Sequence, residues 1–95
     1  MTDLLRVAAA EPVLPGVVKL RWSDGYEGFV DLRPIIKDGE IFAPLRDPDR
    51  FMRVQIEEHG HGIFWLDDDG DEIDFGCDRL RELSERQAAL LDLAG

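Results

Sequence analysis

The sequence predicts one small α+β domain, in which about five short antiparallel strands are combined with short helical turns and a C-terminal helix. Three observations support this class. Short apolar runs, several of them alternating with polar residues, are separated by glycines and prolines. Prolines interrupt the middle of the chain too often for a long helix. Residues 78–94 carry apolar side chains at helical spacing. The 95 residues contain no linker or repeat, so we expect a single domain over residues 1–95.

The first strand is expected at residues 5–10, where Glu11 and Pro12 close it because proline cannot donate a hydrogen bond to a sheet ladder. Residues 17–22 and 26–32 then form a hairpin.

The register of this hairpin is decided by the charges. A two-residue turn would bring acidic residues onto the apolar face, whereas a three-residue loop with Gly25 in the left-handed conformation keeps them off it. We therefore expect Trp22 opposite Tyr26, and Arg21 opposite Glu27 on the outer face.

The middle of the chain, residues 33–50, predicts helical turns lying against the sheet. The apolar anchors of these turns are Ile35, Ile36, Phe42, Leu45 and Phe51. Residues 52–57 alternate and residues 63–66 are all apolar, which predicts a second hairpin whose returning strand is buried on both faces.

The C-terminal helix is predicted at about residues 78–94, with a capping box of Ser84 and Gln87 that could restart it. Its narrow stripe comprises Leu80, Leu83, Gln87, Leu90, Leu91 and Ala94. The expected role of this stripe is packing on the domain's own sheet, and the alternative is a homodimer or partner contact.

The charge is strongly acidic and uneven. The chain contains 11 Lys and Arg and 21 Asp and Glu, which gives a net charge of −10. This charge argues against direct binding of nucleic acid, because phosphate groups would be repelled. Residues 1–56 carry nine acids and eight bases, whereas residues 57–95 carry twelve acids and three bases. One cysteine, no signal-peptide pattern and no long apolar run predict a cytoplasmic protein without a membrane role.

The densest acidic segment holds six carboxylates within eight residues and no base. They are Asp67, Asp68, Asp69, Asp71, Glu72 and Asp74. The spacing fails as a calcium loop, because the position counted from Gly70 for the bidentate Glu is occupied by Gly76. We interpret the segment as a solvated turn and a candidate acidic face for a basic protein partner.

Other reactive side chains give weak signals. His59 and His61 could point to one side of a strand beside Glu57, but two histidines without a further His or Cys do not make a convincing zinc site. Acidic neighbours of Cys77 would raise the pKa of its thiol, which is unsuitable for a nucleophile. We therefore assign no catalytic, cofactor-binding or metal-binding residue and expect no cofactor.

The order of several short motifs resembles a known bacterial family. The motifs are Val-Lys-Leu-Arg-Trp-Ser-Asp-Gly, Val30-Asp31-Leu32, Phe42-Ala-Pro-Leu45-Arg-Asp47 with Phe51, Trp65, and Asp74-Phe-Gly-Cys-Asp78-Arg-Leu80. The chain is similar over about residues 7–80 to the family catalogued as domain of unknown function 2442, and departs from it in the longer acidic stretch 67–72. The resemblance implies a curved antiparallel sheet and supplies no catalytic residues. Some relatives look like members of toxin and antitoxin pairs, and some append a helix-turn-helix for which this chain leaves too few residues.

Three functional hypotheses remain. The first is a non-catalytic protein-interaction module, including the neutralising or regulatory member of a bacterial two-gene pair, that binds a basic partner through its acidic second half. The second is a small-ligand or metal-binding domain. The third is a minimal enzyme that uses carboxylates. A deep apolar pocket would favour the second and a buried carboxylate pair in a cleft the third.

Overall fold

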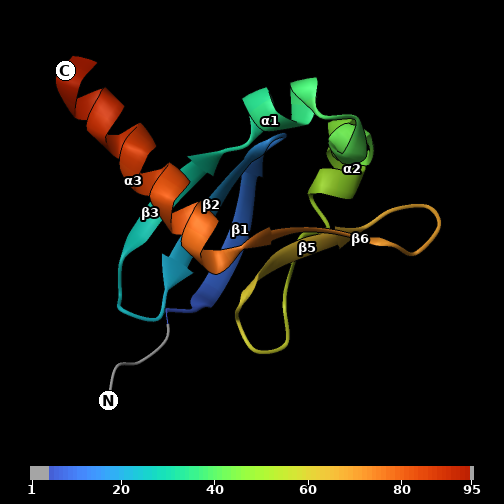
Figure 1. Ribbon diagram of the computed structural model, residues 1–95, viewed down its shortest axis with the longest axis horizontal. Coiled ribbons are helices and arrows are strands. Elements are labelled where there is room, and N and C mark those ends of the chain that lie inside the picture. Colours follow the sequence, from blue (N-terminus) through green and yellow to red (C-terminus); the bar gives the residue numbers. More distant parts are fainter. Residues whose placement is uncertain (1–4, 95) are drawn as a thin grey trace.

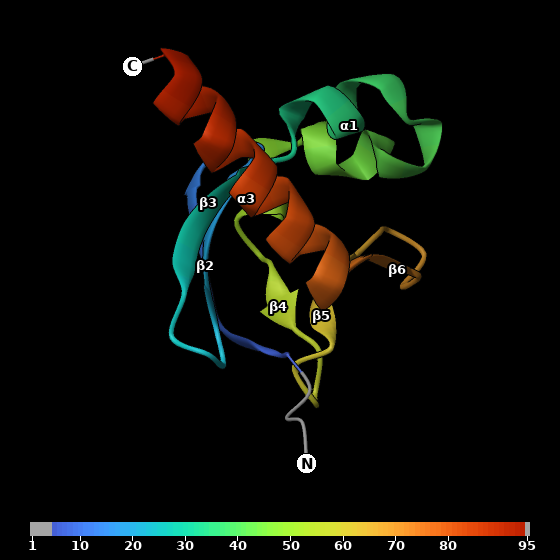
Figure 2. The same ribbon diagram turned by 60° about the vertical axis from the view of Figure 1, so that its left-hand side comes forward.

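The computed structural model describes residues 5–94 and confirms the α+β class. Within these residues, six strands form two antiparallel sheets of three strands each, rather than one sheet of about five. The first sheet has the order β1 (Val7–Leu14), β2 (Val17–Trp22) and β3 (Glu27–Asp31), and the second has the order β4 (Gln55–Ile56), β5 (Gly62–Leu66) and β6 (Glu72–Gly76). The helices are α1 (Arg33–Asp38), the 3₁₀ helix η1 (Glu40–Arg46), α2 (Pro48–Phe51) and α3 (Cys77–Ala94). Figures 1 and 2 show their arrangement.

The predicted register of the first hairpin is confirmed. Arg21 pairs with Glu27, and the Trp22 amide donates to the Tyr26 carbonyl over 2.9 Å. Gly25 has a φ of 90°, the left-handed conformation that a residue without a Cβ adopts at low cost. The alternation of apolar and charged residues therefore fixed which side chains of β2 and β3 face the core.

The predicted end of the first strand is wrong. Strand β1 continues through Glu11 and Pro12 to Leu14, and the two register shifts along it make the strand irregular. Pro12 pairs with Val18, whose peptide groups face β3. The Pro12 nitrogen therefore points to the open side of β1, and no ladder hydrogen bond is lost.

The short helices follow the prolines, as expected. Pro34 and Pro48 occupy the first turns of α1 and α2, where the missing N–H costs nothing. The anchors Ile36, Leu45 and Phe51 are buried, and Ile35 and Phe42 pack against them half-buried. The strand expected at residues 52–57 is reduced to two residues, because residue 52 still caps α2.

The second sheet differs from the prediction in two ways. Strand β5 buries Ile63 and Trp65, whereas Phe64 is half-buried and Leu66 is 42% exposed, so it is covered on one face only. Strand β6, which was not predicted, alternates in the same way and buries Ile73 and Phe75. The alternation of buried and exposed residues in β6 was not recognised, because its exposed positions belong to the acidic segment.

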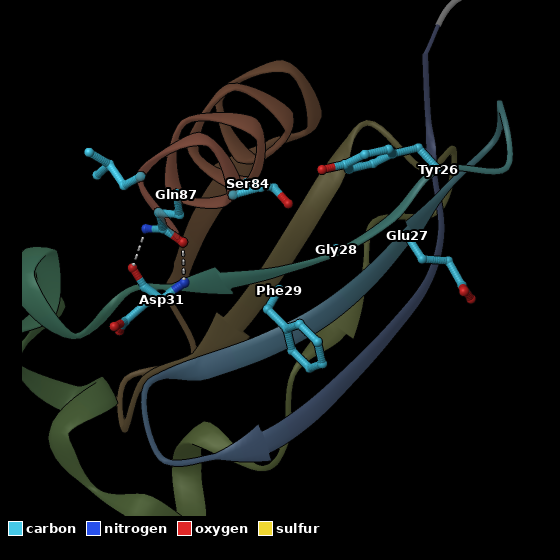
Figure 3. A pocket seen from close by; sticks show the side chains of 9 residues that line it. Tyr26, Glu27, Gly28, Phe29, Asp31, Ser84 and Gln87 are labelled. Carbon is cyan, nitrogen blue, oxygen red and sulfur yellow. Dashed lines mark hydrogen bonds between the residues drawn. The ribbon is translucent and has the colours of Figure 1, made fainter. Parts of the chain in front are cut away.

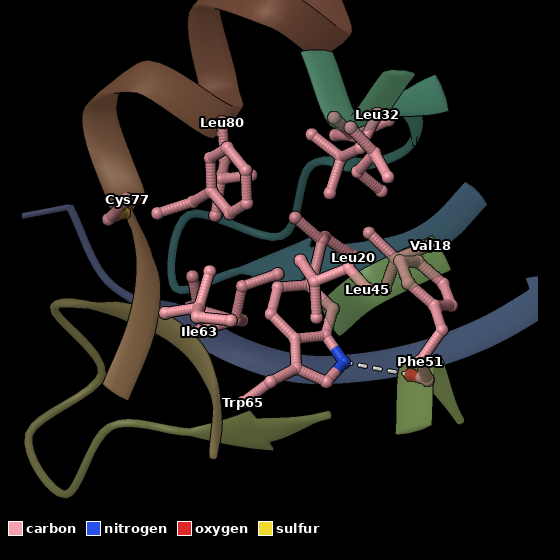
Figure 4. Close-up of a cluster of buried hydrophobic side chains, with 14 of the residues drawn as sticks. Val18, Leu20, Leu32, Leu45, Phe51, Ile63, Trp65, Cys77 and Leu80 are labelled. Atoms are coloured by element: carbon pink, nitrogen blue, oxygen red, sulfur yellow. Dashed lines mark hydrogen bonds between the residues drawn. The ribbon is translucent and has the colours of Figure 1, made fainter. Parts of the chain in front are cut away.

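Helix α3 is continuous through Ser84, so the restarted helix and its capping box are wrong. The side chain of Ser84 is buried, and that of Gln87 contacts β3 instead of the helix backbone. Leu80 is fully buried in a core shared by both sheets, which Figure 4 shows with Leu20, Leu45, Ile63 and Trp65 around it. Within residues 5–94, no helix combines the length and apolar character needed to cross a membrane.

A backbone hydrogen bond joins the two sheets, and a buried side-chain bond attaches α2 to the second sheet. The Val7 amide donates to the Gly60 carbonyl over 2.8 Å, which connects β1 to the turn between β4 and β5. The Trp65 indole Nε1–H donates to the carbonyl of Phe51 over 2.8 Å, as Figure 4 shows, and this buried bond fixes α2 on β5. Their rings also stack, with centroids 5.2 Å apart.

Candidate functional site

The acidic segment forms the tip of the β5–β6 hairpin. One carboxylate oxygen of Asp67 accepts the backbone N–H groups of Asp69 and Asp71, each over 2.9 Å, and Gly70 closes the turn with a φ of 83°. Asp67 is half-buried and acts within its own turn, since a short carboxylate side chain readily replaces a backbone acceptor there. This residue has a structural role in the turn.

A second member of the acidic segment is also engaged inside the chain. Arg50 of α2 forms an ion pair with Asp68 and donates to the carbonyl of Leu66. Asp69, Asp71, Glu72 and Asp74 are exposed, and none of them forms a salt bridge to a described residue.

The predicted acidic face thus reduces to four free carboxylates at the hairpin tip and along β6. In Figure 1 this tip points away from the body on the side opposite the C-terminal end of α3. The hairpin tip and the C-terminal half of α3 therefore do not form one continuous surface.

The carboxylates of Asp67, Asp69 and Asp71 lie within 4.8 Å of one another, a spacing that could hold a cation. The Asp67 oxygen in this group already accepts two backbone hydrogen bonds, and the cluster is open to water. Exposed acidic turns of this kind are held by their own backbone bonds. The absence of a structural metal stays a prediction.

The two histidines lie in a turn built like the acidic one. Glu57 accepts the backbone N–H groups of His59 and His61 over 3.1 Å and 3.0 Å, and the bond from His61 is the main reason why the pKa of Glu57 is lowered. The imidazole centroids are 5.8 Å apart. In the described chain these three residues do not bring three ligand atoms together, so the structure gives the zinc hypothesis no support.

Cys77, at the start of α3, is buried, and its Sγ lies 3.4 Å from the carbonyl oxygen of Leu5. Burial raises the pKa of the thiol, and the carboxylate of Asp78 raises it further. The thiolate is therefore scarce at neutral pH, and the geometry is unsuitable for a nucleophile.

A groove of about 560 Å³ lies between β3 and α3, a feature that was not predicted from the sequence. We call it the β3–α3 groove, and Figure 3 shows it. Tyr26, Phe29 and Leu90 provide aromatic and aliphatic surface, and Glu27 and Asp31 are the charged residues that line it. Phe29 is 57% exposed and Leu90 is 60% exposed, which is unusual for large apolar side chains. Figure 3 shows the Phe29 ring on the side of β3 that faces away from Ser84 and Gln87.

The floor of the groove is formed by polar contacts between α3 and β3. The amide of Asp31 donates to Gln87 Oε1 over 2.9 Å, and Gln87 Nε2 donates to the carbonyl of Asp31 over 3.0 Å. Figure 3 shows both bonds. The side-chain amide of Gln87 thus takes the place of a peptide group from a neighbouring strand.

Ser84 lies one turn before Gln87 and is 1% exposed. Its hydroxyl has no hydrogen-bond partner among the described residues, and a Cβ added to Gly28 would lie 2.2 Å from it. Glycine at position 28 therefore permits α3 to approach β3 closely.

Arg81 of α3 lies beside the groove, against the ring of Tyr26. Its guanidinium stacks 4.1 Å from the centroid of the Tyr26 ring and forms ion pairs with Asp24 at 2.9 Å and Glu85 at 3.0 Å. The pKa of Asp24 is lowered, first by the backbone N–H of Tyr26 and then by Arg81. Arg81 thereby fixes the β2–β3 turn to α3.

A protein-family model described as a protein of unknown function, DUF2442, matches residues 9–85. The chain belongs to the DUF2442 family. This confirms the resemblance in the sequence. A solved structure similar to this DUF2442 chain is described as "Putative DNA Binding Protein NE0471" from Nitrosomonas europaea ATCC 19718, with a TM-score of 0.72 and 26% identity. The match covers 94% of this chain and 56% of that chain, so this DUF2442 chain spans little more than half of its length. No curated protein shows a significant match.

The sequence contained two signals for the groove of this DUF2442 domain. Gln87 interrupts the apolar stripe of α3 at a position that faces the sheet. Gly28 has no side chain at a position on the apolar face of β3, where Ser84 approaches instead. The predicted capping box explained Gln87 locally. Only the contact of Gln87 with Asp31, across 56 residues of sequence separation, shows what Gln87 does.

Proposed function

We propose that this DUF2442 domain is a non-catalytic protein-interaction module that binds a basic protein partner. The observation that carries the proposal is the charge distribution, because residues 57–95 have twelve acids against three bases. Four of these acids are exposed on the β5–β6 hairpin without a salt bridge to any described residue. Their mutual repulsion does not stabilise the folded monomer, whereas a basic surface would neutralise it.

The chemistry of the site supports binding rather than catalysis. The Cys77 thiol is buried with a raised pKa, and the carboxylates of the hairpin are solvated rather than paired in a cleft. Catalytic acids and bases act in a site that positions them against a substrate and limits access of water, and the exposed hairpin does not provide such a site.

A bacterial two-gene pair fits this proposal, with the DUF2442 domain as the neutralising or regulatory member. The similar Nitrosomonas protein is described as a "Putative DNA Binding Protein", but nearly half of that chain lies outside the match. A net charge of −10 would repel phosphates. We therefore propose that this chain contacts a basic protein and leaves direct contact with nucleic acid to other chains or domains.

The test begins with co-purification from the native host, mass spectrometry and reconstitution with the purified partner. Association rates are then compared between two triple variants with the same change of net charge. The hairpin variant carries Asp71→Asn, Glu72→Gln and Asp74→Asn. The control variant carries Glu11→Gln, Asp38→Asn and Glu40→Gln, at exposed positions of the first half.

The hairpin variant should associate roughly three- to tenfold more slowly at low salt, with a flatter salt dependence and a less changed dissociation rate. The control should change the rate less, because its charges lie away from the acidic face. If both variants slow association equally, the effect depends on the net charge of the protein and not on the position of the hairpin acids, which would contradict binding through the acidic face. Unchanged rates for both would contradict binding through the acidic face.

A further inference from the structure

Strand β3 is an edge strand of the first sheet, with β2 on one side only. In an antiparallel pair, alternate residues point both of their peptide groups toward the neighbouring strand. The Trp22 amide bonds to the Tyr26 carbonyl, and the Leu32 amide bonds to the Gly16 carbonyl. The even-numbered residues of β3 therefore face β2, and Glu27, Phe29 and Asp31 point their peptide groups away from it.

The contact with Gln87 agrees with this alternation, because its amide satisfies the outward N–H and C=O of Asp31. Nothing comparable covers the rest of the edge. Beyond the ladder with β2, no hydrogen bond from the described residues reaches the peptide groups of Glu27 or Phe29. This open edge is two outward-facing residues long, and it lies along the β3–α3 groove.

The chemistry of the groove specifies its occupant. Phe29 and Leu90 offer exposed apolar surface, Glu27 supplies negative charge, and no Lys or Arg lines the groove among the described residues. The carboxylate of Asp31 is already paired with Arg33 at 2.8 Å. The nearby Arg81 is already held by two carboxylates. The hydroxyl of Ser84 is an unpartnered and buried polar group in the groove lining.

We propose that the β3 edge at Glu27 and Phe29 receives an extended segment of a basic protein partner, which adds a strand to the first sheet and lies in the β3–α3 groove. Outward peptide groups supply main-chain hydrogen bonds, and side chains alternating along the segment meet the apolar surface and the carboxylate of Glu27. The inference rests on the proposed function and adds a second contact for the basic partner, separate from the β5–β6 hairpin.

A second copy of this chain fits the edge less well. Antiparallel pairing of two β3 strands about Phe29 would place Glu27 opposite Asp31 of the partner copy twice, and like charges directly opposite are destabilising. Gln87 already occupies the peptide groups of Asp31 that such pairing needs. Each copy also carries a net charge of −10.

The probe is an acetylated and amidated decapeptide of alternating lysine and valine, titrated against the full chain by fluorescence anisotropy and amide NMR. The comparison peptides replace every lysine by glutamate or two of the valines by proline. Ala88→Arg extends a long side chain into the groove. The matched control is Ala89→Arg, which adds the same charge at the next exposed helix position and does not line the groove.

Binding should shift the amide signals of Glu27 and Phe29, and Ala88→Arg should weaken it about tenfold or more while Ala89→Arg changes it about twofold or less. Phe29→Pro removes an outward N–H without touching the β2 ladder, so it should keep the fold and weaken binding. The glutamate and proline peptides should not bind.

Three outcomes would overturn the inference. If the amide NMR shifts are confined to the β5–β6 hairpin, the peptide binds at the acidic tip and not at the β3 edge, and the proposed function stays intact. No binding of the lysine peptide at millimolar concentration would refute strand addition, while the reconstituted partner still tests the function by itself. A dimer seen by sedimentation and abolished by Ala88→Arg would show that a second copy occupies the edge.

Discussion

Gln87→Glu tests how α3 is attached to β3. The wild-type side chain accepts one hydrogen bond from Asp31 and donates another to it, at 2.9 Å and 3.0 Å. A glutamate carboxylate can still accept from the Asp31 N–H, but it cannot donate to the carbonyl, and one of its oxygens then faces that carbonyl. A lost hydrogen bond and a poorly satisfied acceptor cost about 1 to 3 kcal/mol in buried sites.

Because Gln87 is half-buried, we expect the lower part of this range, about 1 to 2 kcal/mol at neutral pH. For a domain of this size, each kcal/mol lowers the melting temperature by roughly 4 to 8 °C. Urea unfolding and calorimetry measure the change, with Ala89→Glu as the control that adds the same charge on the exposed side of α3.

The pH dependence gives the sharper test. Repulsion by the carbonyl disfavours the ionised carboxylate, so the pKa of the introduced Glu is raised in the folded state above its ordinary value of about 4.3. The destabilisation is therefore complete above the folded-state pKa and disappears as the pH falls below the ordinary value, where the protonated acid donates again. Equal stability of Gln87→Glu and Ala89→Glu, or a loss that acid does not reverse, would refute the assignment of these two bonds.

Four further predictions concern stability. Gly25→Val should lower the free energy of unfolding by about 1 to 2 kcal/mol in urea, since its φ of 90° suits glycine and no clash contributes. Trp65→Phe should cost about 1 to 3 kcal/mol by calorimetry, because it leaves the buried Phe51 carbonyl without its donor. The hydrogen bond from Arg33 is the main cause of the lowered pKa of Asp31, so this pair stabilises the fold above an ordinary pKa of about 4 and loses that effect as the pH falls further. Asp31→Asn should flatten the acid unfolding curve accordingly. EDTA should leave the melting temperature unchanged, and a fall of several degrees would reveal a structural metal.

The sequence by itself determined the local structure wherever a repeating pattern and a buried face coincide. The alternation along residues 17–22 and 26–31 selects one hairpin register, because a slip by one residue would turn the charges inward. The left-handed φ of Gly25 and the proline-started helices follow from the conformational preferences of single residues. The acidic tip is likewise visible as six carboxylates, although which of them remain free is not.

The tertiary structure alone decided which elements share a sheet and which polar groups meet. Pro12 is tolerated in β1 because its nitrogen faces an open edge, and the strand continues where a local rule would end it. Arg50 engages Asp68 across 18 residues, and Gln87 engages Asp31 across 56. Local preferences act over a few residues, whereas such contacts depend on how the two sheets and α3 pack together. The β3–α3 groove arises from this packing, so it is a property of the fold that no single segment encodes.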